Sequence, residues 1–307
     1  MNDRRILDPV LLASDVRVDE DGVPGCEGLS FRTKGEHVLV LGAPRALFLA
    51  AVGLRPVVRG ALTVRGVAAD EAVGYGLIAG AALDPPLPPR WTVHEYVEWS
   101  ARLSGAPPAE AKSVAAGAIA RLKLEPMAKT RLSMLVPHAR RATVVAAALA
   151  ASTEIVALED PLGGLPEEVA ASYGAVLLEA LADRAWLVFA PRIALTSPFA
   201  RAAEDALVLS ATRVDGQGPP AELASTPAPG KTEHQALRWI ARLDGALEPV
   251  REALAARGSS LEEQGAHVLL DLAAGTTTSE LAAICAAADV AILELMPVSR
   301  PIARAFL

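Results

Sequence analysis

The stretch that decides the fold is residues 154–166, Glu-Ile-Val-Ala-Leu-Glu-Asp-Pro-Leu-Gly-Gly-Leu-Pro. It begins with a short apolar run, which is typical of a strand buried on both faces of a parallel sheet. Two carboxylates, Glu159 and Asp160, follow that run, and the proline and glycines after them predict a turn. A helical pattern over residues 167–182 then leads to a second apolar run at 186–190. Together these segments predict a βαβ unit of a parallel sheet.

The residues before this unit predict further strands and then a block of helices. Alternating apolar and polar residues, punctuated by Asp and Gly, are typical of strands. The expected strands lie at residues 10–18, 29–32, 38–41 and 61–67, with a helix at 46–53 before the last of them. Apolar residues spaced three and four apart predict helices at 92–104, 109–122 and 139–151. We therefore expect an α/β domain over residues 1–215, with a helical subdomain at about 80–150.

The rest of the chain predicts a linker and a second domain. Residues 216–230 combine several prolines and glycines with few apolar residues, which is typical of a linker. Residues 231–307 alternate between strand and helix patterns. The strands are expected at 236–241, 267–272 and 290–294, and the helices at 247–256 and 279–287. This order predicts a small α+β C-terminal domain.

Composition limits the classes of protein to consider. The chain has 307 residues, of which 52% are hydrophobic, enough for one large core or two smaller ones. The formal net charge of −7 argues against a nucleic-acid partner, because such proteins usually present a basic face. No apolar run approaches the roughly 20 residues of a spanning helix, and the N-terminus lacks a secretory pattern, so we expect a cytoplasmic protein. Cys26 and Cys285 are expected to be buried thiols, and the five histidines show no metal-ligand spacing.

The segments that connect these elements resemble the ATP-binding subunit of an ABC transporter, of the exporter type that carries a small C-terminal domain. Residues 38–42 resemble the strand that enters the family's phosphate loop, and residues 73–75 resemble the strand before its glutamine loop. Residues 87–96 match the start of the helical subdomain, 140–150 the signature helix and 154–165 the Walker B region. The resemblance implies an ABC-type P-loop NTPase-like domain with a helical subdomain, followed by a small α+β domain.

The residues at the family's functional positions depart from the chemistry of ATP hydrolysis. A phosphate loop requires G-x-x-x-x-G-K-[ST], because glycine amides cradle the phosphates, lysine reaches the β and γ oxygens and the hydroxyl holds Mg²⁺. The matching segment, Gly42-Ala43-Pro44-Arg45 and onward, is about four residues shorter and has neither lysine nor hydroxyl. The degenerate positions are Gly42 and Arg45 in the phosphate loop, Ile78 in the glutamine loop, Val136 in the signature, the transposed acids Glu159 and Asp160, and Pro191 at the switch.

The loss of lysine, metal ligands and water-positioning groups together removes most of what drives phosphoryl transfer. We therefore predict a pseudo-ATPase without cofactor or metal, a catalytically inactive subunit that neither binds nor hydrolyses ATP. The resemblance implies that it is the structural or regulatory partner of a transmembrane permease at the inner face of the cell membrane, paired with itself or with a second ABC ATPase subunit. Two alternatives stay open: a soluble scaffold of a motility, envelope or secretion assembly, and a residual nucleotide-binding ABC ATPase in which Arg45 contacts a phosphate.

Aromatic residues are scarce, yet Trp91, Tyr96 and Trp99 lie close together in the sequence. They predict either ordinary helix packing or, together with Leu83, a groove that receives a short helix of a membrane partner. The glycine string at residues 74–80 also raises the alternative of a dinucleotide-binding oxidoreductase. That alternative is weak, because the prolines that follow the string cannot continue a helix.

Overall fold

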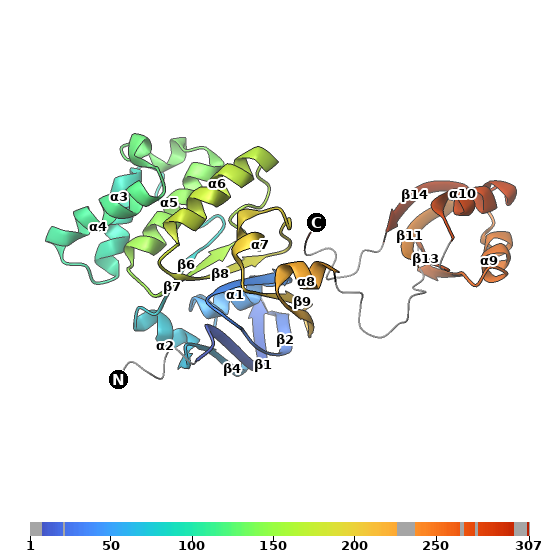
Figure 1. Ribbon diagram of the computed structural model, residues 1–307, viewed down its shortest axis with the longest axis horizontal. Coiled ribbons are helices and arrows are strands. Elements are labelled where there is room, and N and C mark those ends of the chain that lie inside the picture. The colour runs from blue at the N-terminus through green and yellow to red at the C-terminus, as the bar shows by residue number, and fades with distance from the viewer. Residues whose placement is uncertain are drawn as a thin grey trace. The chain divides into compact units, whose positions relative to one another are not determined.

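The computed structural model describes residues 8–20, 22–225, 237–264, 267–273, 276–297 and 306 (Figure 1). It divides the chain into two compact units. The first unit comprises Met1–Ser225 with Pro301–Leu307, and the second comprises Thr226–Arg300. Two hydrophobic clusters stabilise the first unit and a third stabilises the second, so each unit has a core of its own.

A six-stranded sheet forms the centre of the first unit, in the order β10-β9-β3-β8-β7-β6. Its strands are β3 (His37–Gly42), β6 (Ile78–Ala81), β7 (Ile155–Glu159), β8 (Ala185–Ala190), β9 (Asp205–Leu209) and β10 (Val214–Gly218). All neighbouring pairs are parallel except β9 and β10. The predicted βαβ unit is confirmed, because α6 (Glu167–Ala180) connects β7 to β8 and every residue of these two strands is buried.

A second, antiparallel sheet lies beside the first, and one helix packs between the two (Figure 1). This sheet has the order β2-β1-β4-β5. Its strands are β1 (Leu11–Glu20), β2 (Val23–Arg32), β4 (Arg59–Val64) and β5 (Val67–Ala68), and the helix between the sheets is α1 (Arg45–Ala51). Phe48 of α1 meets Phe189 of β8 edge to face, with ring centroids 5.6 Å apart. This contact ties α1 to the parallel sheet.

A block of helices covers the other face of the six-stranded sheet (Figure 1). It contains α3 (Val93–Leu103), α4 (Pro108–Arg121), α5 (Pro137–Ala150), α6, α7 (Pro198–Ala202) and the short 3-10 helices Glu125–Met127 and Leu132–Met134. The predicted helical subdomain is therefore confirmed. Helix α3 begins with a capping box, in which the Thr92 hydroxyl accepts the Glu95 N–H and the Glu95 carboxylate accepts the Thr92 N–H.

The predicted strand at residues 73–75 is wrong. Helix α2 (Ala69–Gly74) occupies that region, and its first turn carries Asp70 and Glu71, which a helix N-terminus stabilises electrostatically. The strand that follows is β6, whose first residue, Ile78, is buried. The assignment of Ile78 to the glutamine loop is therefore also wrong, because the chain leaves the sheet only after Ala81.

The second unit is a small α+β fold, as predicted. Its elements are β11 (Leu237–Asp244), α9 (Leu247–Ala255), β12 (Ser260–Gln264), β13 (His267–Leu272), α10 (Thr278–Ala287) and β14 (Ala291–Pro297). The antiparallel sheet has the order β12-β13-β11-β14, which with the βαββαβ sequence of elements is a ferredoxin-like arrangement. The sequence did not predict β12. It is an edge strand whose Glu262 and Glu263 are exposed, and charges of this kind are common on edges because they discourage pairing with other chains.

The boundary between the units differs from the predicted linker at 216–230. Strand β10 pairs with β9, and helix α8 (Pro220–Ser225) follows it, so the first residues of that range belong to the first unit. Residues 226–230 lie outside the described part of the chain. Phe306, which the sequence assigns to the C-terminal domain, is buried in the core of the first unit with Leu223.

Two chain-wide properties bear on function. No helix within the described residues is long and apolar enough to cross a membrane. Cys26 and Cys285 are free and buried, as predicted, and burial raises the pKa of both thiols. Neither is an activated cysteine.

Candidate functional site

The candidate site lies at the carboxyl ends of β3 and β7, where open α/β sheets usually bind ligands. The loop between β3 and α1 starts at Gly42, whose φ of 99° is in a region that only glycine adopts readily. The Gly42 N–H donates to the Pro191 carbonyl at 3.1 Å, and the Ala43 N–H donates to the Leu209 carbonyl at 3.2 Å. Pro44 has no N–H at all. The first three residues of this loop therefore offer no free amide to a phosphate.

Arg45 is the cation of the site. It is the first residue of α1, and its Nη1 lies 2.7 Å from the Glu159 Oε1 atom at the end of β7. Its Nε lies 3.3 Å from the Glu20 Oε1 atom at the end of β1. The Arg45 side chain is 63% exposed. Arg45 thus joins three elements that are distant in sequence, while solvent still reaches its guanidinium.

Glu159 is almost completely buried, with 9% of its side chain exposed. Its Oε1 atom accepts from Arg45, and its Oε2 atom accepts the Leu83 N–H at 3.1 Å. A buried carboxylate requires such partners, because it has lost its hydration. Both oxygens of Glu159 therefore have a structural role, and the segment after β6 is held against the end of β7.

Asp160 turns its carboxylate toward the following loop. Its φ of 38° is left-handed, and its N–H donates to the Phe189 carbonyl at 2.7 Å. A Cβ placed on Gly163 would overlap the Asp160 carboxylate, so a side chain at this position would require the carboxylate to move. Arg141 binds the same loop by donating to the Gly163 carbonyl at 2.7 Å. The two neighbouring acids thus have separate local roles.

Burial raises the pKa of the Asp160 carboxyl, and the nearby Arg141 guanidinium opposes this shift. The folded state therefore binds the Asp160 proton more tightly than the unfolded state does. The stability that the protonated carboxyl contributes at low pH is lost as the pH rises through its folded-state pKa. We expect Asp160→Asn, which suits a left-handed backbone, to gain stability relative to the parent chain between about pH 4 and pH 7. Urea unfolding across that range measures this difference.

Asp183→Asn is the matched control for that experiment. Arg121 hydrogen-bonds Asp183 and lowers the pKa of its carboxyl. The stability contributed by Asp183 is therefore present at neutral pH and lost as the pH falls, so the effect of this substitution should run in the opposite direction. An Asp160→Asn difference that does not vary with pH contradicts the assignment.

The structure brings together only part of the predicted site. Gly42, Arg45, Glu159 and Pro191 meet directly or through shared contacts, whereas Ile78 lies inside β6. Val136 stands before α5, is 48% exposed and makes no side-chain cap hydrogen bond. Sequence reasoning missed three contributors, namely Glu20, Arg141 and the main chain of Leu83. Glu20 ends a strand before a turn, a place where an acidic residue is unremarkable.

Comparison with known proteins identifies the fold. No family model and no curated protein matches the chain. Among solved structures, cbiO1 from Clostridium perfringens, described as part of the ABC transporter complex cbiONQ, is 19% identical over 70% of this chain and 90% of its own, with a TM-score of 0.60. The ADP conformation of MJ1267, an ATP-binding cassette, is 15% identical over 68% and 91%, with a TM-score of 0.58. The dimeric ABC transporter cassette MJ0796 is 17% identical over 68% and 98%, also with a TM-score of 0.58.

Over about 70% of its length, the chain has the fold of these ABC-type ATP-binding subunits. The predicted fold class is thereby confirmed, whereas the exporter-type assignment of the C-terminal domain stays a prediction. The comparisons contradict the prediction of a subunit that does not bind ATP, because the similar structures are ATP-binding subunits or cassettes and one is an ADP conformation. They favour the alternative of a residual nucleotide-binding subunit. At identities of 15–19% the likeness itself shows the fold alone.

The ABC-type fold implies Mg²⁺ and ATP as ligands. The residues of this site suit a phosphate group better than they suit Mg²⁺. The loop has no lysine or hydroxyl, and both Glu159 oxygens already have partners. Within the described residues, no group of three or more His, Cys, Asp and Glu side chains could hold a metal ion. The site therefore does not fit Mg²⁺ held in the usual way. It does fit a phosphate, because the exposed Arg45 guanidinium is a suitable donor.

In this ABC-type fold the predicted partner-binding aromatics lie at the start of the helical subdomain. Trp91 and Trp99 meet edge to face, with ring centroids 5.6 Å apart and an interplanar angle of 81°. Trp99 is 44% exposed, whereas Tyr96 packs against the core and burial raises the pKa of its hydroxyl. Leu83 is half-buried. The aromatic pair therefore combines helix packing with an exposed apolar edge.

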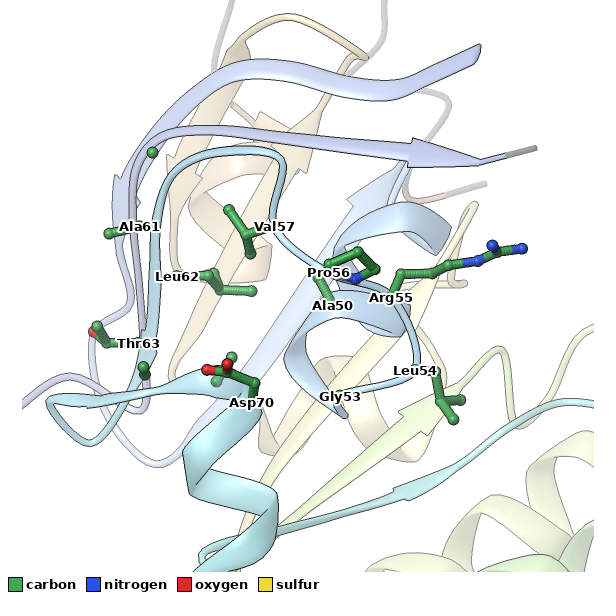
Figure 2. Close-up of a pocket in the computed structure, with 13 residues that line it drawn as sticks. Ala50, Gly53, Leu54, Arg55, Pro56, Val57, Ala61, Leu62, Thr63 and Asp70 are labelled. Carbon is green, nitrogen blue, oxygen red and sulfur yellow. The ribbon is translucent and has the colours of Figure 1, made fainter. Parts of the chain in front are cut away.

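A separate cavity of about 460 Å³ lies beside the end of α1 (Figure 2). It is lined mainly by the segment after α1, by β4 and by the start of α2, and none of the site residues described above lines it. Figure 2 shows Val57, Pro56 and Leu62 around the cavity and the Arg55 side chain extending away from it. The cavity is therefore mostly apolar and distinct from the Arg45 site.

Proposed function

We propose that this chain is the ATP-binding subunit of an ABC-type transport complex and that it retains residual nucleotide binding at Arg45. One observation carries the proposal: a solvent-accessible guanidinium stands at the carboxyl ends of the sheet strands, at the start of the helix that follows the phosphate-loop segment. Arginine presents several N–H donors in a fork that matches phosphate oxygens. The ABC-type fold of the similar ATP-binding proteins supports this choice of ligand.

The two carboxylates around Arg45 determine how a phosphate would bind. The pair with Glu159 is short and buried on the carboxylate side, so breaking it would leave an unpaired charge. The pair with Glu20 is longer, at 3.3 Å, and solvent reaches both side chains, which are 63% exposed for Arg45 and 30% exposed for Glu20. Exposed ion pairs contribute little, about 0–1 kcal/mol, so a phosphate can replace Glu20 at small cost. Arg45 then keeps its contact with Glu159 while it binds the ligand.

We expect Arg45→Ala to weaken ATP and ADP binding by about tenfold or more, because charge-assisted hydrogen bonds to the phosphate are lost. Isothermal titration of the full-length chain measures the affinity. Arg45→Lys should retain part of the binding, since the charge remains without the fork. Arg102→Ala, an exposed arginine at the end of α3, should leave binding unchanged. Absence of saturable binding by the parent chain contradicts the proposal.

ATP hydrolysis requires more than the phosphate contact that Arg45 provides. The residues around Arg45 do not fit a metal-assisted attack of water on the terminal phosphate. They favour the prediction that the chain is not an ATPase, which stays a prediction. Release of inorganic phosphate by the purified chain, alone and in its native complex, measures it. Turnover that Arg45→Ala removes would show that the chain is an enzyme.

The proposed partners are a membrane permease and a second ATP-binding subunit, either a copy of this chain or a different one. Similar proteins support this, because cbiO1 is part of a transporter complex and MJ0796 is dimeric. The exposed edge of Trp99 is the proposed contact with the permease, which would place the chain at the inner face of the membrane. Purification from native membranes in mild detergent, followed by mass spectrometry, tests this. Near-stoichiometric recovery of a permease supports the proposal, and recovery of soluble partners alone contradicts it.

A further inference from the structure

We infer that the Arg45 site binds its phosphate ligand without a divalent cation, and that Mg²⁺ weakens the binding. The ligand class is a metal-free nucleotide or another polyphosphate anion that the guanidinium recognises directly. This inference rests on the proposed function, since it concerns the same site. It differs from the usual arrangement of the fold, in which a metal ion bridges carboxylate and phosphate.

The first argument is the engagement of Glu159. In a metal site, the carboxylate at the end of this strand would turn at least one oxygen to the ion. Here Arg45 donates to Oε1 at 2.7 Å and the Leu83 N–H donates to Oε2 at 3.1 Å. The Arg45 guanidinium therefore occupies the position beside Glu159 where a metal ion would bind. It supplies a positive charge there without a metal.

The second argument is the placement of Asp160. Its carboxylate lies against Gly163, whose missing side chain makes the room for it. The positive charges that act on Asp160 come from Arg141 and Arg192, and they lower its pKa against the larger effect of burial. Asp160 and Glu159 therefore do not combine into a pair of ligands, which agrees with the absence of any cluster of metal-ligating side chains in the described ranges.

The third argument is the charge of the ligand. A Mg²⁺ ion bound to a polyphosphate neutralises two of its charges and keeps several water molecules. The lower charge of the complex reduces its attraction to Arg45. The retained water molecules hinder close contact of the phosphate oxygens with the Arg45 N–H groups. Free ATP or ADP therefore suits this site better than the magnesium complex.

The test compares binding in EDTA and in excess Mg²⁺, with the full-length chain and isothermal titration. We expect ATP to bind at least about threefold more tightly in EDTA, and inorganic tripolyphosphate to compete if the phosphates provide the recognition. Arg45→Ala should lose the binding seen in EDTA. An affinity that rises in Mg²⁺ overturns this inference and leaves the proposed function intact, whereas no binding in either buffer overturns the proposed function itself.

Glu159→Gln distinguishes metal-free binding from binding through a metal ion on Glu159. The substitution keeps the shape of the side chain and a carbonyl oxygen for the Leu83 N–H. If Glu159 only holds Arg45, removal of its charge frees the guanidinium, and binding in EDTA should become tighter by about twofold or more. If Glu159 is a metal ligand, the same substitution should weaken binding in Mg²⁺. Circular dichroism of each variant establishes that it is folded, and Arg102→Ala serves again as the control for surface charge.

Discussion

Replacing Trp186 by alanine should lower the free energy of unfolding of the first unit by about 3–5 kcal/mol. Trp186 is 1% exposed and is the second residue of β8. It stacks on His37 with ring centroids 5.0 Å apart, and it meets Phe199 edge to face at 5.3 Å. The substitution removes this buried area, and the surrounding strands cannot collapse into the cavity because their main chains are fixed by the sheet.

Trp99→Ala is the matched control, because it removes the same side chain from a position that is 44% exposed. Its cost should be about 1 kcal/mol, mainly from the lost contact with Trp91. Urea unfolding followed by far-ultraviolet circular dichroism measures both variants without relying on tryptophan fluorescence. Equal costs at the two positions would mean that Trp186 does not have the structural role assigned to it.

The sequence could predict the parallel sheet because its strands are buried on both faces. A continuous apolar run between turn residues, such as residues 186–190, is typical of a strand in this position and too short for a buried helix. Among the elements that the sequence placed incompletely or not at all are two polar strands. Strand β10 reads Val-Asp-Gly-Gln-Gly and β12 reads Ser-Leu-Glu-Glu-Gln, so neither shows the period of a strand. Both lie at sheet edges, where one side faces no neighbour and the apolar signal is weak.

The positions of part of the candidate site were predictable from the sequence, whereas its contacts were not. Glu159 and Asp160 stand out in the sequence, because two acids follow a buried strand. The ion pair between Arg45 and Glu159 joins residues 114 positions apart, and it depends on the short loop that brings α1 close to β7. The role of Leu83 is carried by its main-chain N–H, which no side-chain pattern reveals. These contacts depend on how separate elements pack against one another, and sequence periodicity does not predict that packing.

The misassigned strand at residues 73–75 has a similar cause. Val73 and Tyr75 flank Gly74, an apolar and glycine pattern that suits a strand as well as a helix end. In the structure both residues are exposed, Val73 at 39% and Tyr75 at 71%. The deciding signal is Asp70 and Glu71 in the first turn, because acidic residues favour a helix N-terminus. Short apolar runs remain ambiguous until such flanking charges are considered.

Gly42→Ala should be the most damaging substitution in the loop that forms the Arg45 site, at about 2–4 kcal/mol in unfolding free energy. The φ of Gly42 is 99°, and a Cβ there would overlap the Leu209 carbonyl oxygen on the neighbouring strand. Since that oxygen accepts the Ala43 N–H, the loop cannot move aside without losing this hydrogen bond. We also expect weaker nucleotide binding, because the displaced loop carries Arg45.

Gly76→Ala distinguishes steric overlap from backbone strain. Gly76 also has a positive φ, at 67°, but a Cβ there would meet no atom within 4 Å. Its substitution should cost about 1 kcal/mol, the strain of a left-handed alanine, and leave nucleotide binding unchanged. Chemical denaturation and isothermal titration of both variants measure the two effects. If Gly42→Ala proves as mild as Gly76→Ala, the close packing of β3 against β9 does not shape the loop, and Arg45 must be positioned by its carboxylate partners alone.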